Sequence, residues 1–278
     1  MVARLAGATL RMFFVMVLVL MPSLLLPRAG ADGGQMAALV AILAGVLTFA
    51  EYRTTCPGLV EFRDASPFNR IRFVILFGIV FLLTLLLRAE VIPILPGTLP
   101  GALDMIVGRV RDFVWPSLRL TALMTAGDAS EAQLGMVSSA AVLAGLVSLT
   151  GTAVFVLFLR LTGWPSRAAA FNLWINLPNF DPAGGEDVVA RLERHARISI
   201  LLGLLLPLAI PALVRIGSTG LAPLVLASPQ TLIWTMTAWA FLPCSLFMRG
   251  IAMGRIAKMI REKRTVIGAD RAGIFLSV

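Results

Sequence analysis

Six long apolar stretches, separated by shorter polar segments, form the main pattern along this chain. An α-helix of about 20 apolar residues crosses the hydrocarbon core of a bilayer, so we interpret each stretch as one transmembrane helix. The first three stretches are only about 15 residues long, and a re-entrant or merely buried segment is the alternative for each of them. The stretches are Met12–Leu26, Met36–Ala50, Phe73–Leu87, Leu134–Leu159, Ile198–Val214 and Leu221–Met248.

The residues at the ends of the short stretches favour full crossing. Arg11, Arg72 and Arg88 flank them, and a long arginine side chain can reach the headgroup level while its stem stays among apolar atoms. The pattern therefore predicts an all-α integral membrane protein with a single polytopic membrane domain over residues 1–278. We expect a bundle of about six transmembrane helices, accompanied by amphipathic helices at the interface.

Two amphipathic segments are predicted outside the spans. Between Leu103 and Val114, in the longest loop, apolar residues recur at helical spacing with charged residues mostly opposite. We interpret this segment as a connector that rests on the membrane, in preference to a gate or a docking face. The second segment is the basic tail, residues 249–278, predicted to bend along the membrane surface. The basic residues of the tail that we assign to lipid headgroups are Arg255, Lys258 and Arg261.

Basic residues are distributed unequally between the two sides that the spans define. Of the 24 lysines and arginines, 18 fall on the side that carries both termini. Because basic loops tend to stay in the cytoplasm, both termini are predicted to be cytoplasmic. A cleavable signal peptide ending at Ala31 is the alternative for the first span, and it would leave five spans. We favour an uncleaved span because the next apolar stretch starts only a few residues later.

Three local motifs predict where helices begin. Ser66–Pro67 and Ser228–Pro229 each place a capping serine before a proline, which suits the first turn of a helix. Ser130 with Gln133 forms a capping box before the fourth span. The second Ser-Pro pair lies inside the sixth stretch, so the helix there is predicted to begin near Pro229.

Composition agrees with a membrane protein and points to a location. Hydrophobic residues make up 58% of the chain and charged residues 14%, and the mean hydropathy is +0.90. A soluble domain carries about 25% charged residues. The net charge of +9 lies in short segments beside the spans, so anionic lipid is the expected partner and nucleic acid is not. Arginine outnumbers lysine 22 to 2, which is typical of GC-rich bacterial genomes, and we expect a multi-pass protein of a bacterial inner membrane.

Two cysteines and one histidine limit the chemistry that the chain can perform. Cys56 in a loop and Cys244 within the last span do not form a disulfide scaffold. The single histidine, His195, excludes multi-histidine metal centres and bis-histidine haem ligation. No cofactor and no metal site are predicted. His195 is interpreted as a solvated residue at the membrane boundary, because a proton relay would require an acidic partner within the spans.

The segment between Arg160 and Arg197 is unusually rich in aromatic and asparagine residues. This composition suits a belt at the level of the lipid headgroups. It also suits a recognition surface in which aromatic rings anchor another protein. The residues predicted to bind a partner are Trp164, Phe171, Trp174 and Phe180.

Few polar groups are functional candidates. Glu51, Glu61 and Asp64 could perform acid–base chemistry only if they were held facing each other. Each has an arginine close in the sequence, so surface ion pairs are the preferred interpretation, and Glu51 lies nearest the bilayer. In the last span Thr235 and Gln230 are the polar candidates, although hydrogen bonding between helices is the commoner role for such residues.

Small residues line one face of the second span and one of the fourth. Ala37, Ala41 and Gly45 recur at four-residue spacing, and Ala141 and Gly145 do the same on the fourth span. Such faces allow helix backbones to approach closely. The approach can occur within the chain or between two subunits.

Three functions are compatible with these features, and no motif decides among them. We favour a non-enzymatic accessory, assembly or scaffold protein that binds other membrane proteins, or a second copy of itself, through the small-residue faces and the aromatic segment. The second is a transporter or channel component for a neutral or lipid-like solute, with Pro207, Pro211 and Pro229 as hinges. The third is a membrane enzyme that uses the carboxylates of the first cytoplasmic loop.

Overall fold

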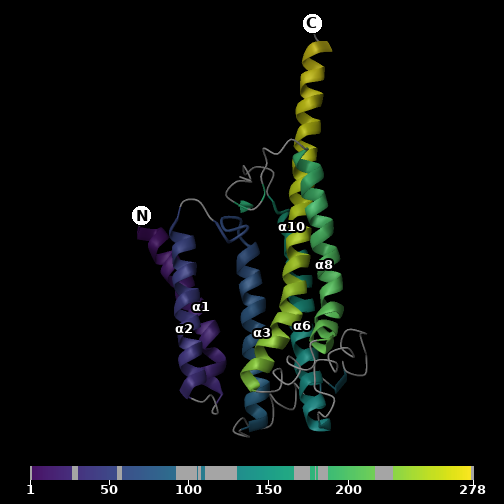
Figure 1. Cartoon of the computed structure of the whole chain (residues 1–278). Coiled ribbons are helices and arrows are strands. Elements are labelled where there is room, and N and C mark those ends of the chain that lie inside the picture. The colour runs from purple at the N-terminus through teal and green to yellow at the C-terminus, as the bar shows by residue number, and fades with distance from the viewer. Residues whose placement is uncertain are drawn as a thin grey trace.

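A computed structural model shows an all-helical bundle (Figure 1). It describes residues 2–26, 31–54, 58–91, 105, 108–109, 130–165, 176–178, 180, 187–216 and 228–276. Both chain ends lie at the same end of the bundle, which we call the terminal end. The long helices are α1 (Val2–Leu25), α2 (Ala31–Arg53), α3 (Phe68–Val91), α6 (Glu131–Thr162), α8 (Val188–Ile216) and α10 (Pro229–Leu276).

All six helices are long and apolar enough to cross a membrane, so the chain is a multi-pass membrane protein. The three stretches that look short in the sequence lie in helices of 24, 23 and 24 residues, because each helix continues into its polar flanks. The first part of the sixth predicted span, residues 221–227, lies outside the described residues. The helix that follows begins at Pro229, as the Ser-Pro pair predicts.

Local hydrogen bonds explain where the helices begin. The predicted capping box of α6 is confirmed: Ser130 Oγ accepts from the Gln133 amide at 3.3 Å, and Gln133 Oε1 accepts from the Ser130 amide at 2.9 Å. At α10 the Ser228 hydroxyl accepts from the Thr231 amide at 3.1 Å. At α3 the prediction is wrong by one residue, since the helix begins at Phe68, after the proline of the Ser-Pro pair.

The basic tail does not bend along the bundle end as expected. Helix α10 continues beyond the last span and projects from the terminal end (Figure 1). Ion pairs with the start of α8 hold this extension in line with the bundle: Arg261 pairs with Glu193, and Arg264 Nη1 donates to Asp187 Oδ1 at 2.6 Å. This hydrogen bond holds the pKa of Asp187 below its ordinary value.

Helices α8 and α10 form an antiparallel pair that depends on glycine. At Gly250 an added Cβ would lie 2.7 Å from Ile200 Cγ1 and 2.8 Å from the Ala196 carbonyl oxygen. At Gly203 it would lie 3.1 Å from the Pro243 carbonyl oxygen. The two backbones therefore approach as closely as small residues allow.

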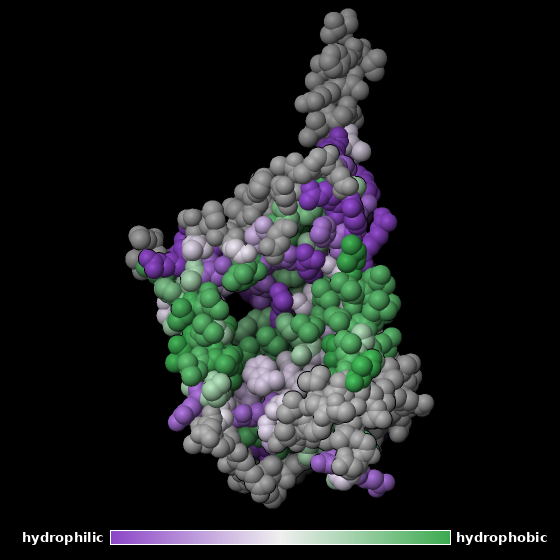
Figure 2. All heavy atoms as spheres, in the orientation of Figure 1, coloured by the Kyte–Doolittle hydropathy of each residue, from purple (hydrophilic) through white to green (hydrophobic). Residues whose placement is uncertain are grey.

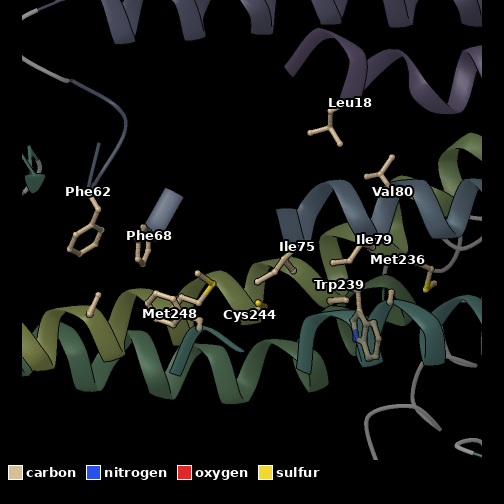
Figure 3. Close-up of a cluster of buried hydrophobic side chains, with 14 of the residues drawn as sticks. Leu18, Phe62, Phe68, Ile75, Ile79, Val80, Met236, Trp239, Cys244 and Met248 are labelled. Carbon is tan, nitrogen blue, oxygen red and sulfur yellow. The ribbon is translucent and has the colours of Figure 1, made fainter. Parts of the chain in front are cut away.

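Helices α1 and α2 form a hairpin at one side of the bundle (Figure 1). Gly45 of α2 lies against α1, where an added Cβ would be 2.7 Å from Met16 Cγ. Helix α1 packs on α3, and Leu18 of α1 points towards Val80 of α3 (Figure 3). The outward face of α2 remains apolar and exposed, with Leu39 64% exposed, as expected for a surface in contact with lipid tails.

The core lies between α3, α6 and α10. Gly151 of α6 contacts Ile75 of α3 so closely that a Cβ would have no room. Ala141 of α6 is fully buried, and a Cβ at Gly145 would touch Trp239 of α10 at 4.0 Å. Residues of the predicted small-residue faces on α2 and α6 thus serve packing within the chain. Figure 3 shows buried side chains that α3 and α10 contribute to this core.

Candidate functional site

The segment from Gly58 to Pro67, which leads into α3, is folded against the terminal end of the bundle; we call it the docked segment. Glu51, in the last turn of α2, anchors its start. One carboxylate oxygen of Glu51 accepts hydrogen bonds from the amides of Gly58, Leu59 and Val60, each at 2.9 Å. Three amide donors to one buried carboxylate make Glu51 a structural anchor rather than an acid–base group.

Glu61 joins the docked segment to the last helix. Its carboxylate receives two hydrogen bonds from the guanidinium of Arg249, at 2.6 and 2.8 Å, although the two residues are 188 positions apart. Arg249 also donates to Ser199 of α8 at 2.8 Å. The side chains of Glu61 and Arg249 are 15% and 26% exposed, so this ion pair is shielded from solvent. Within the described residues, the expected ion pair with a neighbouring arginine is found for Asp64, whose Oδ1 lies 3.2 Å from Arg63 Nε.

Phe62 fixes the docked segment in the core. Its ring is fully buried and lies 4.4 Å from Phe68 and 6.4 Å from Trp164, measured between ring centroids (Figure 3). Its φ of 55° is in the left-handed region, which costs a non-glycine residue about 1–2 kcal/mol. Its amide donates to the Asn176 carbonyl at 2.6 Å. Burial of the ring and this hydrogen bond offset the backbone strain.

Arg72, in the second turn of α3, lies over an aromatic ring of the last helix. Its guanidinium carbon lies 5.6 Å from the centre of the Phe241 ring of α10. Phe241 precedes Arg249 by eight residues, which places it about 12 Å further along the helix, towards the middle of the membrane. Glu61 and Arg249, together with Cys244 and Tyr52, are the titratable groups that interact electrostatically with Arg72. Within the described residues, no hydrogen bond or ion pair engages the Arg72 guanidinium.

The hydrophobic surface of the molecule is hollowed between two groups of helices (Figure 2). Figure 2 shows two blocks of hydrophobic atoms, which correspond in Figure 1 to the α1–α2 hairpin and to the α8–α10 pair. The hollow between them faces sideways, where a membrane would lie, and hydrophilic atoms reach into its upper part. We call this feature the lateral hollow. Leu76 follows Arg72 by one turn on α3, and both side chains are partly buried.

Proline in the spans leaves carbonyl groups that need other partners. Pro211 has no amide hydrogen, so the carbonyl of Pro207 loses its helical donor. Trp239 Nε1 of α10 replaces that donor at 3.0 Å. The hydroxyls of Ser148 and Thr237 are buried and have no hydrogen-bond partner within the described part of the chain.

Two of the four aromatic residues predicted to bind a partner are described, and both contact other residues of the chain. Trp164 is partly buried and packs edge-on against Phe62. Phe180 is 4% exposed and stacks with Arg191, whose guanidinium carbon is 4.8 Å from its ring centre. The remaining two, Phe171 and Trp174, lie outside the described residues. A partner at this segment therefore stays a prediction.

The other candidate residues have mostly internal roles. Gln230 Nε2 donates to Ser23 Oγ of α1 at 3.1 Å, which joins the hairpin to α10 at the end opposite the terminal end. Thr235 is partly buried. Arg255 donates to the carbonyl oxygens of Leu159 and Trp164, so its guanidinium caps the C-terminal end of α6. Lys258 is exposed, and its Nζ lies 3.9 Å from Glu262 Oε1. Arg261 is also exposed and pairs with Glu193.

Sequence reasoning missed the two features that define the site. It interpreted Arg72 as an arginine that extends to the headgroups, and it gave Glu61 a neighbouring partner. The available signal for Arg72 was a charge at the border of an apolar stretch, which does not reveal the ring opposite it. Within the described residues, no group of three His, Cys, Asp or Glu side chains could hold a metal ion.

The sequence matches no protein-family model, no curated protein and no solved structure with which it was compared. The function is therefore argued from the site itself. The site combines a laterally open hollow with apolar walls, and hydrophilic atoms reach into its upper part (Figure 2). Such a site can bind an amphiphile, and its engaged carboxylates do not suit proton transfer.

Proposed function

We propose that this protein binds a lipid-like solute that enters the lateral hollow from the surrounding bilayer, and moves it between the membrane and the terminal end. The observation that carries this proposal is the hollow itself, which faces sideways between two apolar helix pairs (Figure 2). Lipid tails are solvated by apolar walls, whereas a water-soluble solute would need an aqueous path. We further propose that the terminal end faces the cytoplasm of a bacterial cell, because most basic residues lie there.

The α1–α2 hairpin is the element that could open the hollow. Helix α2 packs on α1, and α1 in turn packs on α3. Contact between α1 and α10 is slight, and among the described residues it includes a hydrogen bond from Gln230 to Ser23. A hairpin attached to the bundle mainly through α1 can move against the other helices as a unit.

The other two functions have less support in the described residues. The accessory protein would use small-residue faces and aromatic rings, but Ala141, Gly45 and Phe180 already pack within the chain. Of the predicted partner-binding residues, Phe171 and Trp174 lie outside the described residues, and the accessory function depends mainly on them. The enzyme would need free carboxylates, but Glu51 caps the docked segment and Glu61 is bound by Arg249.

Photocrosslinking in detergent micelles tests the proposal. The purified protein is titrated with a diacyl lipid that carries a photoreactive acyl chain, and adducts are mapped by mass spectrometry. We expect saturable adducts on the helices that border the hollow, suppressed by excess unmodified lipid. Adducts on the outer face of α2 should rise without saturation. Adducts that follow surface exposure alone would contradict the proposal.

A matched pair of variants makes the test specific. Leu76→Trp should add bulk to a partly buried position of α3, the helix that lies between the hairpin and α10 in Figure 1, and should reduce the saturable adducts. Val74→Trp is the control, because Val74 is 67% exposed and lies only two residues away. Flipping of a fluorescent lipid in proteoliposomes then measures movement. We expect Leu76→Trp to slow it and Val74→Trp to leave it unchanged.

A further inference from the structure

We infer that exposed arginines at the terminal end bind the phosphate groups of anionic phospholipids in the adjoining leaflet. We call them the arginine belt. Each belongs to a different helix, and each stands at the end of an exposed apolar stripe. This inference goes beyond the proposed function and does not depend on it. The residues of the belt are Arg53 of α2, Arg70 of α3, Arg160 of α6 and Arg197 of α8.

The apolar stripes follow the helical repeat. On α8 the residues 4, 7 and 11 positions after Arg197 are Leu201, Leu204 and Leu208, which are 55%, 58% and 40% exposed. These spacings place the three leucines and the arginine on one face of the helix. Stripes with spacings of 3, 4, 7 or 11 residues from the arginine recur on the other three helices. Their exposed residues are Val46 and Ile42 on α2, Val74 and Phe81 on α3, and Leu157 and Leu149 on α6.

The belt presents positive charge to the surroundings of the bundle. Arg53, Arg70 and Arg160 are exposed, and no hydrogen bond or ion pair engages them within the described residues. Arg197 is 81% exposed, and its ion pair with Glu193 measures 3.7 Å. Such an exposed pair contributes little, so it does not compete strongly with another anion.

Contacts with α10 place two residues of the belt at similar depths. At Gly250 of α10, an added Cβ would lie 2.8 Å from the carbonyl oxygen that precedes Arg197. Five residues further along α10, or about 7.5 Å, Arg255 donates to the carbonyl oxygen that precedes Arg160. Side chains lean towards the start of their own helix, and α6 and α8 run in opposite directions. The two guanidiniums therefore lean towards one headgroup layer, which is about 5–7 Å thick.

The lengths of the spans agree with a membrane boundary at the belt. On α3, Arg70 and Arg88 are 18 residues apart, which corresponds to about 27 Å. On α8, Arg197 and the exposed Ile216 are 19 residues apart, or about 28 Å. The hydrocarbon core of a bilayer is about 30 Å thick, so both helices fit when the belt lies among the headgroups.

The same boundary leaves the basic tail outside the headgroup layer. Lys263 follows Gly250 by 13 residues, which places it about 20 Å further out along α10. The tail projects from the terminal end in line with the bundle (Figure 1). Its exposed lysines, Lys258 and Lys263, therefore stand in water in this arrangement.

An anionic phospholipid fits both parts of this surface. A guanidinium can donate two parallel hydrogen bonds to a phosphate, and the acyl chains cover the apolar stripe beneath it. Phosphatidylcholine also has a phosphate, but its choline cation opposes the positive charge of the belt. Each basic residue near an anionic membrane surface strengthens binding about fivefold.

Native mass spectrometry in detergent tests the inference with two lipids of identical acyl chains, phosphatidylglycerol and phosphatidylcholine. We expect the protein to prefer phosphatidylglycerol. Arg160→Gln combined with Arg197→Gln should lower this preference at least about fivefold. Lys258→Gln combined with Lys263→Gln is the matched control, because it removes the same charge from two exposed side chains of the tail. The control should keep the preference.

Spin labels in lipid nanodiscs measure the depth of the same positions. Nitroxides would be attached at Leu201→Cys, Arg197→Cys and Lys263→Cys, each combined with Cys56→Ser. We expect the label at 201 to be relaxed mainly by oxygen and the label at 263 mainly by a water-soluble nickel chelate. The label at 197 should lie between them. A label at 263 as shielded as the label at 197 would overturn the inference, because the tail would then lie among the headgroups.

The outcomes of the lipid comparison are equally distinct. Loss of the preference in the arginine variant alone supports the belt. Equal loss in both variants would overturn it, because net charge alone would then decide. Loss in the lysine variant alone, or no preference in the unmodified protein, would also overturn it. The lateral hollow is tested separately, because Leu76→Trp leaves the belt intact and should keep the preference for phosphatidylglycerol.

Discussion

Replacing Glu61 by glutamine should destabilise the whole bundle, because Glu61 ties the docked segment to α10. The change keeps the shape of the side chain but removes the charge that compensates Arg249. Removing one member of a buried ion pair costs about 3–5 kcal/mol. Two facts reduce this cost in stability. The side chains of Glu61 and Arg249 are 15% and 26% exposed, and Arg249 keeps its hydrogen bond to Ser199. We therefore expect a loss of about 2 kcal/mol in the free energy of unfolding.

The measurement is a double-mutant cycle in lipid bicelles. The free energies of unfolding of Glu61→Gln, Arg249→Gln and the double variant would be obtained by steric trapping. We expect a coupling energy of about 1.5 kcal/mol between the two residues, since Arg249 donates two short hydrogen bonds to Glu61. Asp64→Asn is the control, because Asp64 is 54% exposed in its pair with Arg63 and should change stability by less than about 0.5 kcal/mol. A coupling energy indistinguishable from this control would refute the assignment of Glu61 as a tie between segment and bundle.

Three further predictions concern packing, the proline-rich helix and topology. Gly250→Leu should separate α8 from α10 and cost about 1–3 kcal/mol in unfolding free energy. Gly34→Leu is the control and should be neutral, because a Cβ at Gly34 meets nothing within 4 Å. Equal effects of the two substitutions would refute the close approach of α8 and α10. Trp239→Phe should lower the free energy of unfolding by about 1 kcal/mol, because the Pro207 carbonyl loses its donor. The same substitution at the exposed Trp234 should be tolerated, and thermal unfolding in detergent compares the two variants. Reporter fusions at both termini should show a cytoplasmic location for each, and opposite locations would contradict the six-span topology.

Several features of this fold could be predicted because they depend on short stretches of sequence. The capping box of Ser130 and Gln133 and the start of α10 at Pro229 are set by hydrogen bonds between residues only three positions apart. The first three spans were harder to delimit, since their polar flanks look like loops until the helices are seen to continue through them. The predicted direction of the tail was wrong, because this direction depends on ion pairs with another part of the chain, such as that of Arg264 with Asp187 at the start of α8.

The sequence by itself determined the class of protein, the number of helices that can span a membrane, and the even count that brings both termini to one side. These properties follow from the length and hydropathy of each segment, because a helix in lipid must satisfy its own backbone hydrogen bonds whatever its neighbours are. Only the tertiary structure decided that Glu61 pairs with Arg249, that Gly45 and Ala141 pack within the chain, and that Arg72 lies against Phe241. Helices of similar hydropathy can be arranged in many ways, and the choice depends on contacts between side chains far apart in the sequence.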